Sequence, residues 1–321
     1  MKRLLFILTT LLACAATLYG EEAEEREKIV FTPQWTSQCQ FAGYYVAQEK
    51  GFYADAGLEV EIKQPSTSKP AIEYLKSGES QIITMQLAQA LCEMGKGAPL
   101  VNILQTSQQS SLLLVSRQPV KDIRDLRGKR IGCWKTNFAV TAQAADHILS
   151  LQIEWIPFIQ NINLFISGAI DGTLATSYNE YYQLLFSGVE LNEEKVIRFS
   201  RIGYDIPEDG VYVTREFYRK HRDLATKFAE ASRKGWEWAA AHPEEALDIA
   251  VRYIRMQETG TNIVLQKYLL EETLRLLHDP TDGRMTFRLK PESVAQANRV
   301  LQEGGILEKP VSYQLLTEGH E

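Results

Sequence analysis

The chain has 321 residues, of which 45% are apolar, and this is enough for one large domain or two ordinary ones. Its formal net charge is −6, from 35 basic and 41 acidic residues, and the sequence contains no strongly basic block. Because phosphate binding needs a clustered positive surface, this charge pattern argues against nucleic acid as a partner.

The first 20 residues have the layout of a secretory signal peptide. Lys2 and Arg3 precede a mostly apolar stretch, residues 4–18, and an acidic run follows. The apolar stretch is roughly 15 residues long, shorter than the ~20 that a membrane-spanning helix needs. We therefore expect residues 1–20 to be removed and the mature protein to be periplasmic or otherwise exported. Residues 11–14 also resemble a lipobox, so a lipid anchor on Cys14 stays an alternative.

Residues 28–115 predict an α/β unit in which strands and helices alternate. Apolar runs predict strands at 28–35, 58–63, 81–85, 100–106 and 111–115, and amphipathic runs predict helices at 41–50, 66–78 and 87–97. Gly51 and Gly78 are placed as C-terminal helix stops. Alternation of this kind implies mostly parallel sheets covered by helices.

A second α/β unit begins near residue 119. Strands are predicted at 130–134, 154–158, 173–177 and 195–200, with helices at 137–149, 162–171 and 178–188 between them. A further strand follows at 210–214, and from residue 215 onward the pattern is almost entirely helical.

Signatures of catalysis and of metal binding are largely missing from the sequence. There is no GxSxG, no GxGxxG after a strand, no P-loop and no HExxH. Beyond the signal, Cys39, Cys92 and Cys133 lack CxxC spacing, and an odd count argues against a disulfide framework or a zinc site. We expect three buried, apolar cysteines, no cofactor, no metal and no enzymatic activity.

The loops that follow the predicted strands are rich in amides, hydroxyls and aromatic rings. In open α/β sheets, ligands bind beyond the carboxyl ends of the strands. Amides donate and accept hydrogen bonds at once, and aromatic faces stack on planar ligands. The sequence therefore predicts a small-molecule binding site at these loops.

Several stretches resemble one known family. The segments "QWTSQCQFAGYYVAQEKGFYADAGLEVEI", "IEYLKSGESQIITMQLAQALCEMGKGAPLVNI", "DLRGKRIGCW" and "GAIDGTLATSYNE" are similar to those of NMT1/thiamine-pyrimidine-synthase-like substrate-binding proteins. The resemblance covers about residues 28–255 and departs at Gln81, where the family usually has Asp. Relatives in this broad group serve ABC importers for thiamine precursors, riboflavin, nitrate, sulfonates and taurine.

The resemblance implies an α/β, two-lobed type II periplasmic binding protein fold with the ligand cleft between the lobes. Lobe 1 is expected to take residues 28–115 and 212–321, and lobe 2 residues 116–211. Residues 111–116 and 210–214 are the hinge candidates. The implied partners are a small-molecule ligand and the ABC permease and ATPase of the inner membrane, and the chain is expected to be a monomer.

The predicted ligand-binding residues all follow strands or open helices. They are Trp35, Gln40, Tyr44, Ser66, Thr67, Gln86, Gln105, Lys135, Asn137, Tyr178, Asn179, Glu180 and Asp205. Trp35 would stack on a planar ring, and Gln40 and Tyr44, one helical turn apart, would share a cleft face. Gln86 and Gln105 end strands. For Ser66 and Thr67 the alternative role is helix capping, and for Asp205 it is turn formation.

Two sets of these residues point to different ligands. In "SYNE", Glu180 matches the position where thiamine-precursor-binding relatives carry an acid, so it would pair with an aminopyrimidine or amine; its alternative role is a favourable charge at a helix start. Lys135 and Asn137 at a helix start would suit a small anion such as a sulfonate or nitrate. The leading function is an exported receptor for a thiamine-type pyrimidine or similar nitrogen heterocycle. The alternatives are an anion receptor, a pyrimidine-synthase-like enzyme and a sensory input subunit.

Overall fold

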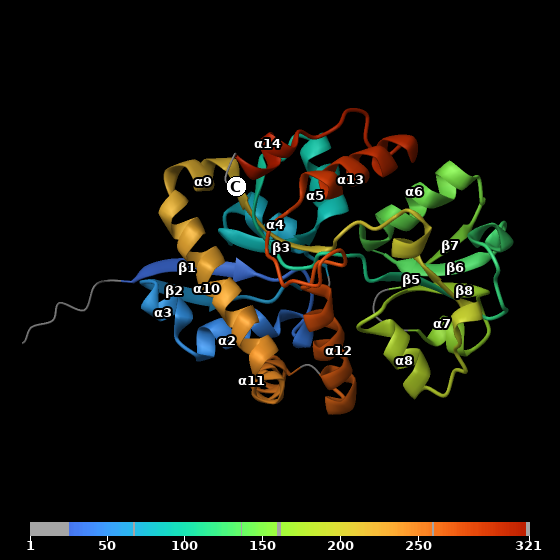
Figure 1. The fold of residues 1–321 in the computed structure, drawn as a ribbon, viewed down its shortest axis with the longest axis horizontal. Helices are drawn as coiled ribbons and strands as arrows, with labels where there is room; N and C mark the ends of the chain where they lie inside the picture. The colour runs from blue at the N-terminus through green and yellow to red at the C-terminus, as the bar shows by residue number, and fades with distance from the viewer. Residues whose placement is uncertain (1–25, 67, 136, 159–161, 259, 319–321) are drawn as a thin grey trace, which may run out of the picture.

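The computed structural model describes residues 26–66, 68–135, 137–158, 162–258 and 260–318. Within these ranges the chain builds two lobes, each around a five-stranded sheet (Figure 1). The predicted signal peptide, Cys14 and Thr67 lie outside the described residues. None of the helices described there is both long and apolar enough to cross a membrane.

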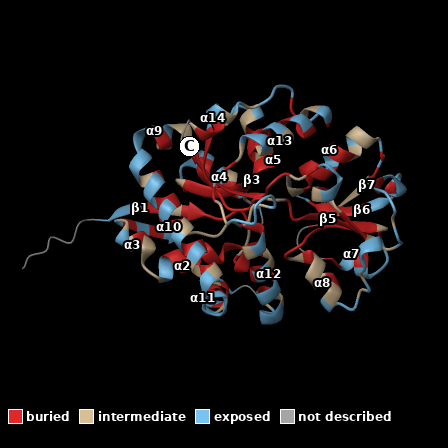
Figure 2. Cartoon of the chain, in the orientation of Figure 1, coloured by how far each residue is buried: buried red, intermediate tan, exposed pale blue. Residues whose placement is uncertain are grey.

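The first sheet has the strand order β2-β1-β3-β10-β4. Its strands are β1 (Glu27–Thr32), β2 (Leu58–Ile62), β3 (Ile82–Gln86), β4 (Leu100–Gln105) and β10 (Asp209–Thr214). The sequence of β10 alternates between the two faces, because Val211 and Val213 join one apolar cluster and Tyr212 joins the other. Apolar side chains therefore leave this sheet on both faces, and both faces are covered by helices (Figure 2).

The helices of the first lobe come from both ends of the chain. The N-terminal part supplies α2 (Ala42–Glu49), α3 (Phe52–Asp55), α4 (Ala71–Ser77) and α5 (Leu87–Gly95). The C-terminal part supplies α9 (Arg215–Lys220), α10 (Arg222–Ala241), α11 (Pro243–Met256), α12 (Ile263–Leu276), α13 (Pro291–Glu303) and α14 (Tyr313–Thr317). Pro243 and Pro291 open α11 and α13, where their missing N–H removes no helical hydrogen bond.

The second sheet repeats the arrangement of the first, with the order β7-β6-β8-β5-β9. Its strands are β5 (Leu112–Ser116), β6 (Arg130–Trp134), β7 (Glu154–Phe158), β8 (Gly172–Thr176) and β9 (Val196–Arg198), and its α-helices are α6 (Val140–Leu149), α7 (Asn163–Ile166) and α8 (Glu180–Phe186). In both sheets the strand that follows a lobe crossing, β5 or β10, lies between two antiparallel neighbours. The prediction of mostly parallel sheets holds for four of the five strands in each sheet, and β10 and β5 are the antiparallel exceptions.

The structure also corrects the predicted hinges. Residues 112–116 form β5, which is buried inside the second sheet, and residues 210–214 belong to β10, buried inside the first. Backbone groups held in a ladder on both sides cannot absorb a large change in φ and ψ. The segments that cross between the sheets are residues 106–111 and 199–208, so a boundary after residue 115 cuts through the end of β5.

A close contact between two helices fixes the start of the chain to the C-terminal part. Gly43 of α2 faces Gly235 of α10, and a Cβ at Gly235 would lie 2.1 Å from the carbonyl oxygen of Gly43. Only glycine permits this approach. Because α2 directly follows the loop after β1, this packing holds that loop against the first lobe.

Candidate functional site

A small pocket lies between the two lobes, at the carboxyl ends of the parallel strands. Its lining residues are Gln34, Trp35, Gln38, Gln40 and Gln86 from the first lobe, and Trp134, Phe138, Thr176, Tyr178, Asn179 and Glu180 from the second. The cavity volume is about 30 Å³, close to the ~30 Å³ that one water occupies in the liquid. Ligand pockets usually measure ~300–1,000 Å³, so a heterocycle can enter only if the lobes part.

The first-lobe wall is the loop that links β1 to α2. The backbone N–H of Gln34 donates to Thr84 Oγ1 in β3, at 2.7 Å. The backbone N–H of Cys39 donates to Gln266 Oε1 in α12, at 2.8 Å. These two bonds fix the loop on both sides, because a strand of the sheet holds one end and a C-terminal helix holds the other.

Three glutamines of this loop are linked by hydrogen bonds to one buried acid, Asp209, two of them directly and the third through its neighbour. We call these four residues the amide relay. Gln34 Nε2 donates to Asp209 Oδ1 at 2.5 Å, and Gln40 Nε2 donates to Asp209 Oδ2 at 2.6 Å. Gln38 Nε2 donates to Gln40 Oε1 at 2.6 Å. All four residues are buried, and Asp209 itself lies behind the pocket wall, at the start of β10.

The relay depends on the charge of Asp209. Burial raises the pKa of this carboxyl to about 6, and the bonds from Gln40 and Gln34 act in the opposite direction. The carboxyl is therefore mostly ionised at neutral pH, and both of its oxygens act as acceptors. An ionised acid at this place forces the NH₂ groups of Gln34 and Gln40 to point toward it.

The second-lobe wall carries its acid, Glu180, directly on the pocket. Glu180 is 6% exposed and is the first residue of α8. Its Oε2 accepts from the backbone N–H and the hydroxyl of Thr176, at 2.9 and 2.7 Å. Its Oε1 accepts from the indole N–H of Trp134 at 3.1 Å and from the amide of Asn179 at 3.4 Å. Every one of these donors is neutral.

Aromatic rings frame the pocket from both lobes. Trp35 from the first lobe meets Phe138 from the second edge-on, with ring centroids 5.2 Å apart. Trp134 meets the same Phe138 edge-on at 6.3 Å. These rings provide the planar, apolar surfaces on which a heterocycle can stack when the lobes close.

A second aromatic contact joins the lobes outside the pocket. Tyr182 of α8 stacks on Tyr268 of α12, with ring centroids 4.7 Å apart, and Phe186 lies 5.7 Å from the same ring. Phe186 and Tyr268 are exposed, at 46% and 38%. We call Tyr182, Phe186 and Tyr268 the aromatic rim. It bridges the two helices that carry Glu180 and Gln266.

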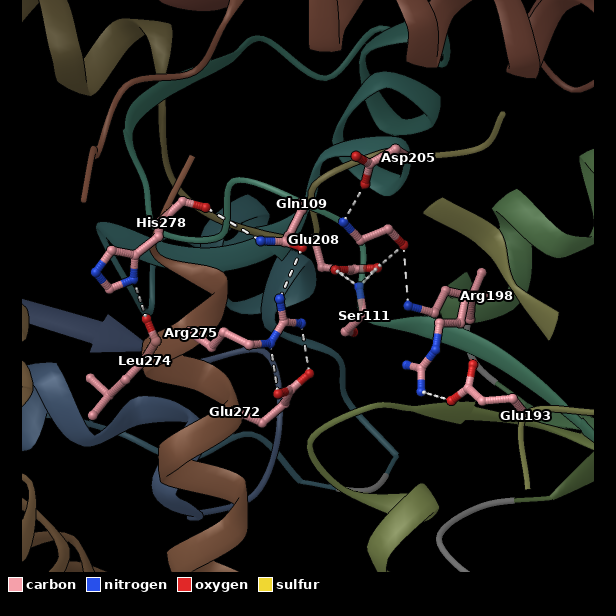
Figure 3. Close-up of polar contacts among 12 residues, drawn as sticks. Gln109, Ser111, Glu193, Arg198, Asp205, Glu208, Glu272, Leu274, Arg275 and His278 are labelled. Atoms are coloured by element: carbon pink, nitrogen blue, oxygen red, sulfur yellow. Dashed lines mark hydrogen bonds and ion pairs between the residues drawn. The ribbon is translucent and has the colours of Figure 1, made fainter. Parts of the chain in front are cut away.

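The two crossing segments are bound to each other by acids. Glu208 accepts from the hydroxyl of Ser110 at 2.7 Å and from the backbone N–H of Ser111 at 2.9 Å, and Asp205 accepts from the backbone N–H of Ser110 at 2.6 Å (Figure 3). Burial raises the pKa of Glu208 to about 8, against the effect of these bonds. The acids of the second crossing segment thus bind the first.

An arginine fastens the first crossing segment to α12. Arg275 donates to Gln109 Oε1 at 3.0 Å and forms an ion pair with Glu272 at 2.7 Å (Figure 3). Gln109 in turn donates to the backbone oxygen of His278 at 3.4 Å. The crossing region is therefore connected to the helix that also holds the pocket loop.

The structure brings six of the predicted residues together around the pocket. They are Trp35, Gln40, Gln86, Tyr178, Asn179 and Glu180. They come from strand ends and helix starts far apart in sequence, and the rule of ligand sites at carboxyl strand ends finds them.

Five predicted residues do not line the pocket. Tyr44 packs in the first-lobe core against Phe31 and Trp236, since α10 covers the face of α2 that was assigned to the cleft. Gln105 is fully enclosed, and its amide donates to the backbone oxygens of Ser107 and Asp209.

The other three lie on loops outside the pocket lining. Ser66 is exposed in a turn and accepts from the backbone N–H of Lys69; it caps no helix, because α4 begins at Ala71 after Pro70. Lys135 is exposed, and its backbone N–H donates a hydrogen bond to the carbonyl oxygen of Phe158. Asp205 belongs to the crossing contacts. The structure does not describe the side chain of Asn137.

Sequence reasoning misses Gln34, Gln38, Trp134, Phe138 and Thr176 as lining residues. Each stands at or near a strand end, which is the signal that could have found them. Asp209 is missed for another reason: "GYDIPEDG" is typical of a turn, and nothing in it indicates a partner in the first loop. Cys39, Cys92 and Cys133 are free and buried, as predicted.

Comparisons with known proteins identify the family. The riboflavin-binding protein RibY of Chloroflexus aurantiacus is 23% identical over 309 residues, which cover 90% of this chain and 84% of that protein. A formylaminopyrimidine-binding protein of Halalkalibacterium halodurans is 24% identical over 284 residues, 83% of this chain and 81% of that one. The crystal structure of the aliphatic sulphonate binding protein SsuA of Escherichia coli shares the fold, with a TM-score of 0.62, 13% identity and coverage of 90% and 91%.

A family model establishes the family, and its match includes residues of both lobes. The model described as NMT1/THI5 like matches residues 38–246, a range that contains α2, both crossing segments and Asp209. The family resemblance and the two-lobed periplasmic binding fold predicted from the sequence are confirmed. The chain belongs to the NMT1/THI5-like family.

Proposed function

We propose that this chain is an exported receptor that captures a planar nitrogen heterocycle between its two lobes and delivers it to the permease and ATPase of an ABC importer. The family, the fold and the position of the pocket between the lobes support a binding role. The relatives named for riboflavin and for formylaminopyrimidine support a nitrogen heterocycle as the ligand class. A thiamine-type aminopyrimidine is the specific ligand that we favour.

One observation carries this proposal: a buried carboxylate faces an aromatic pocket and is bonded only to neutral donors among the described residues. Glu180 has no ion-pair partner there. A buried charge is stabilised when a ligand adds hydrogen bonds or an opposite charge to it. An amino group on a flat ring supplies the donor, while Trp35 and Trp134 supply faces for the ring.

The same observation disfavours a small anion. Among the described lining residues, Glu180 is the charged one, and its field repels a sulfonate or nitrate. Lys135, the cation that motivated the anion alternative, is exposed and does not line the pocket. We therefore place the anion reading second.

Native mass spectrometry of purified protein, followed by calorimetry, tests the proposal. We expect a retained or titrated aminopyrimidine at one per chain and no heat with an alkanesulfonate. Tight sulfonate binding without pyrimidine binding would contradict the ligand class. A turnover assay with the same protein separates binding from catalysis, and product formation would contradict the receptor role.

A further inference from the structure

The amide relay determines which hydrogen-bonding groups the first-lobe wall presents to the pocket. The two ends of a glutamine amide have nearly the same shape, so its orientation is fixed only by its hydrogen-bond partners. Asp209 accepts from Gln34 and Gln40 at once, and so it fixes both amides with NH₂ inward. The other end of the Gln34 amide, turned away from Asp209, is its carbonyl oxygen.

That oxygen is an unsatisfied acceptor. Gln34 is 8% exposed, lines the pocket, and its Oε1 has no hydrogen-bond partner within the described part of the chain. Leaving a buried acceptor without a donor is unfavourable, and a ligand that supplies an N–H removes the penalty. Glu180, on the opposite wall, is a second acceptor.

From these contacts, and resting on the proposed function, we propose that Asp209 sets the donor–acceptor polarity of the pocket. It acts as a positioning residue behind the wall: it turns the carbonyl oxygen of Gln34 toward the ligand and so selects rings that carry an exocyclic N–H donor. Rings of the same size that carry an acceptor at that place are rejected.

The relay also predicts what happens when the acid is replaced by its amide. In Asp209→Asn the side chain keeps one acceptor and gains an NH₂, so one of its two glutamine partners must turn around. If Gln40 turned, its NH₂ would face the NH₂ of Gln38, and Gln38 would have to turn as well. Gln34 can turn alone, because its Oε1 has no described partner to lose.

The variant is therefore expected to present an N–H of Gln34 to the pocket. Its preference should shift from amino toward oxo rings. This shift in preference is a readout that loss of folding or of general affinity would not produce.

The experiment compares two probes of equal size by calorimetry: 4-amino-5-hydroxymethyl-2-methylpyrimidine and its 4-oxo counterpart. For the wild type we expect the amino probe to bind about 10–100-fold more tightly, the usual effect of one unpaired buried acceptor. In D209N this ratio should fall at least about tenfold. The control is E190Q, a carboxylate-to-amide change at an exposed residue outside the pocket, and its ratio should stay within about threefold of the wild type.

A folded D209N that keeps the wild-type ratio would overturn the inference while leaving the binding role intact. If D209N does not fold, Gln34→Met, which removes the outward oxygen, gives the same decision: an unchanged ratio overturns the inference, and a ratio lowered about tenfold supports it. A wild type that binds the amino probe without preference also overturns the inference alone. A wild type that binds neither probe overturns the proposed ligand class and the inference together.

Discussion

The two walls of the pocket each contain one buried acid, but they place it differently. Glu180 lies on the second-lobe wall itself, and its donors come from the neighbouring strand end, the indole of Trp134 and the amide of Asn179. Asp209 lies behind the first-lobe wall, and amides stand between it and the ligand. The second-lobe wall therefore presents a charged carboxylate to the ligand. The first-lobe wall presents neutral amides whose orientation is fixed by a carboxylate behind them.

This difference gives the two walls separate roles: one contributes mainly to the affinity for the ligand, and the other to the selectivity among ligands. A carboxylate on the pocket attracts any N–H donor or cation strongly, with little discrimination among them. An amide whose orientation is fixed from behind interacts more weakly, but it rejects a group of the wrong hydrogen-bonding type. Substitutions on one wall, at the contact between the walls, and at the acid that joins the crossing segments should therefore have different effects.

The largest expected effect concerns Glu208, a buried acid of the second crossing segment. Burial raises the pKa of Glu208, and the nearby Asp209 and Asp205 raise it further. Folding raises its pKa from 4.5 to about 8, so the folded state keeps a proton that the unfolded state releases, and stability falls as pH rises through this range. Glu208→Gln cannot ionise. The free energy of unfolding of the variant minus that of the wild type should therefore increase by on the order of 3 kcal/mol from pH 5 to pH 8. Urea denaturation at each pH measures this difference.

The exposed Glu190→Gln is the control for this measurement, and its curve should follow that of the wild type. Stability curves of wild type and Glu208→Gln that run parallel over the whole pH range would show that Glu208 ionises normally in the folded state.

On the second-lobe wall, Glu180→Gln should weaken binding of an aminopyrimidine by about 10–100-fold. The change keeps the shape of the side chain but removes the charge, and charge-assisted hydrogen bonds are roughly twice as strong as neutral ones. Isothermal calorimetry measures the effect, with Glu190→Gln as the control in the same lobe. An affinity within a few fold of wild type would mean that the ligand does not use Glu180.

A smaller effect is expected when the wall keeps its acid but loses one of its donors. Trp134→Phe retains an aromatic face but removes the indole N–H that donates to Glu180, and affinity should fall about tenfold. Trp155→Phe is a matched control, because Trp155 donates to Asp146 at 3.0 Å in the same lobe without lining the pocket. Equal losses in both variants would point to a general effect on the lobe.

The contact between the walls is tested at the aromatic rim. Tyr268→Ala removes the ring that stacks on Tyr182, and we expect affinity to fall about 3–10-fold, the effect of ~0.5–1.5 kcal/mol per aromatic pair. The loss should appear as faster dissociation by stopped flow, because the rim forms only when the lobes are closed. Tyr268→Phe keeps the ring and should behave as wild type. A change confined to the association rate would refute the closing role.

The smallest effect is predicted for Lys135→Ala, which should leave aminopyrimidine affinity within about twofold, as for surface changes in general. Lys135 is exposed and outside the pocket. A large loss of affinity in the same calorimetric titration would show that Lys135 contacts the ligand in the bound state, and it would favour the anion receptor instead.

The sequence predicts the strands, most helices and the fold, because local patterns determine them. The run "LEVEI" alternates and forms β2, and Gly51 and Gly78 adopt positive φ at helix ends, as predicted. It also places Trp35, Gln86 and Glu180 at the pocket, since all three lie at strand ends or helix starts.

Features that depend on long-range packing could not be predicted. Helical periodicity places Tyr44 on one face of α2 but does not identify what covers that face, which is α10, far along the chain. An apolar run gives no indication of which sheet it joins, so the hinge positions do not follow from the pattern. The amide relay cannot be predicted because Gln40 and Asp209 are 169 residues apart and meet only in the folded chain.

The central claim is that the cleft binds a planar ring through N–H donors that meet buried acceptors. The most direct test is calorimetry on the ligand-free wild type, with an aminopyrimidine and an alkanesulfonate titrated separately at pH 7.5. The account predicts one-to-one binding of the aminopyrimidine with micromolar or tighter affinity and no measurable binding of the sulfonate. Sulfonate binding with no response to the aminopyrimidine would contradict it.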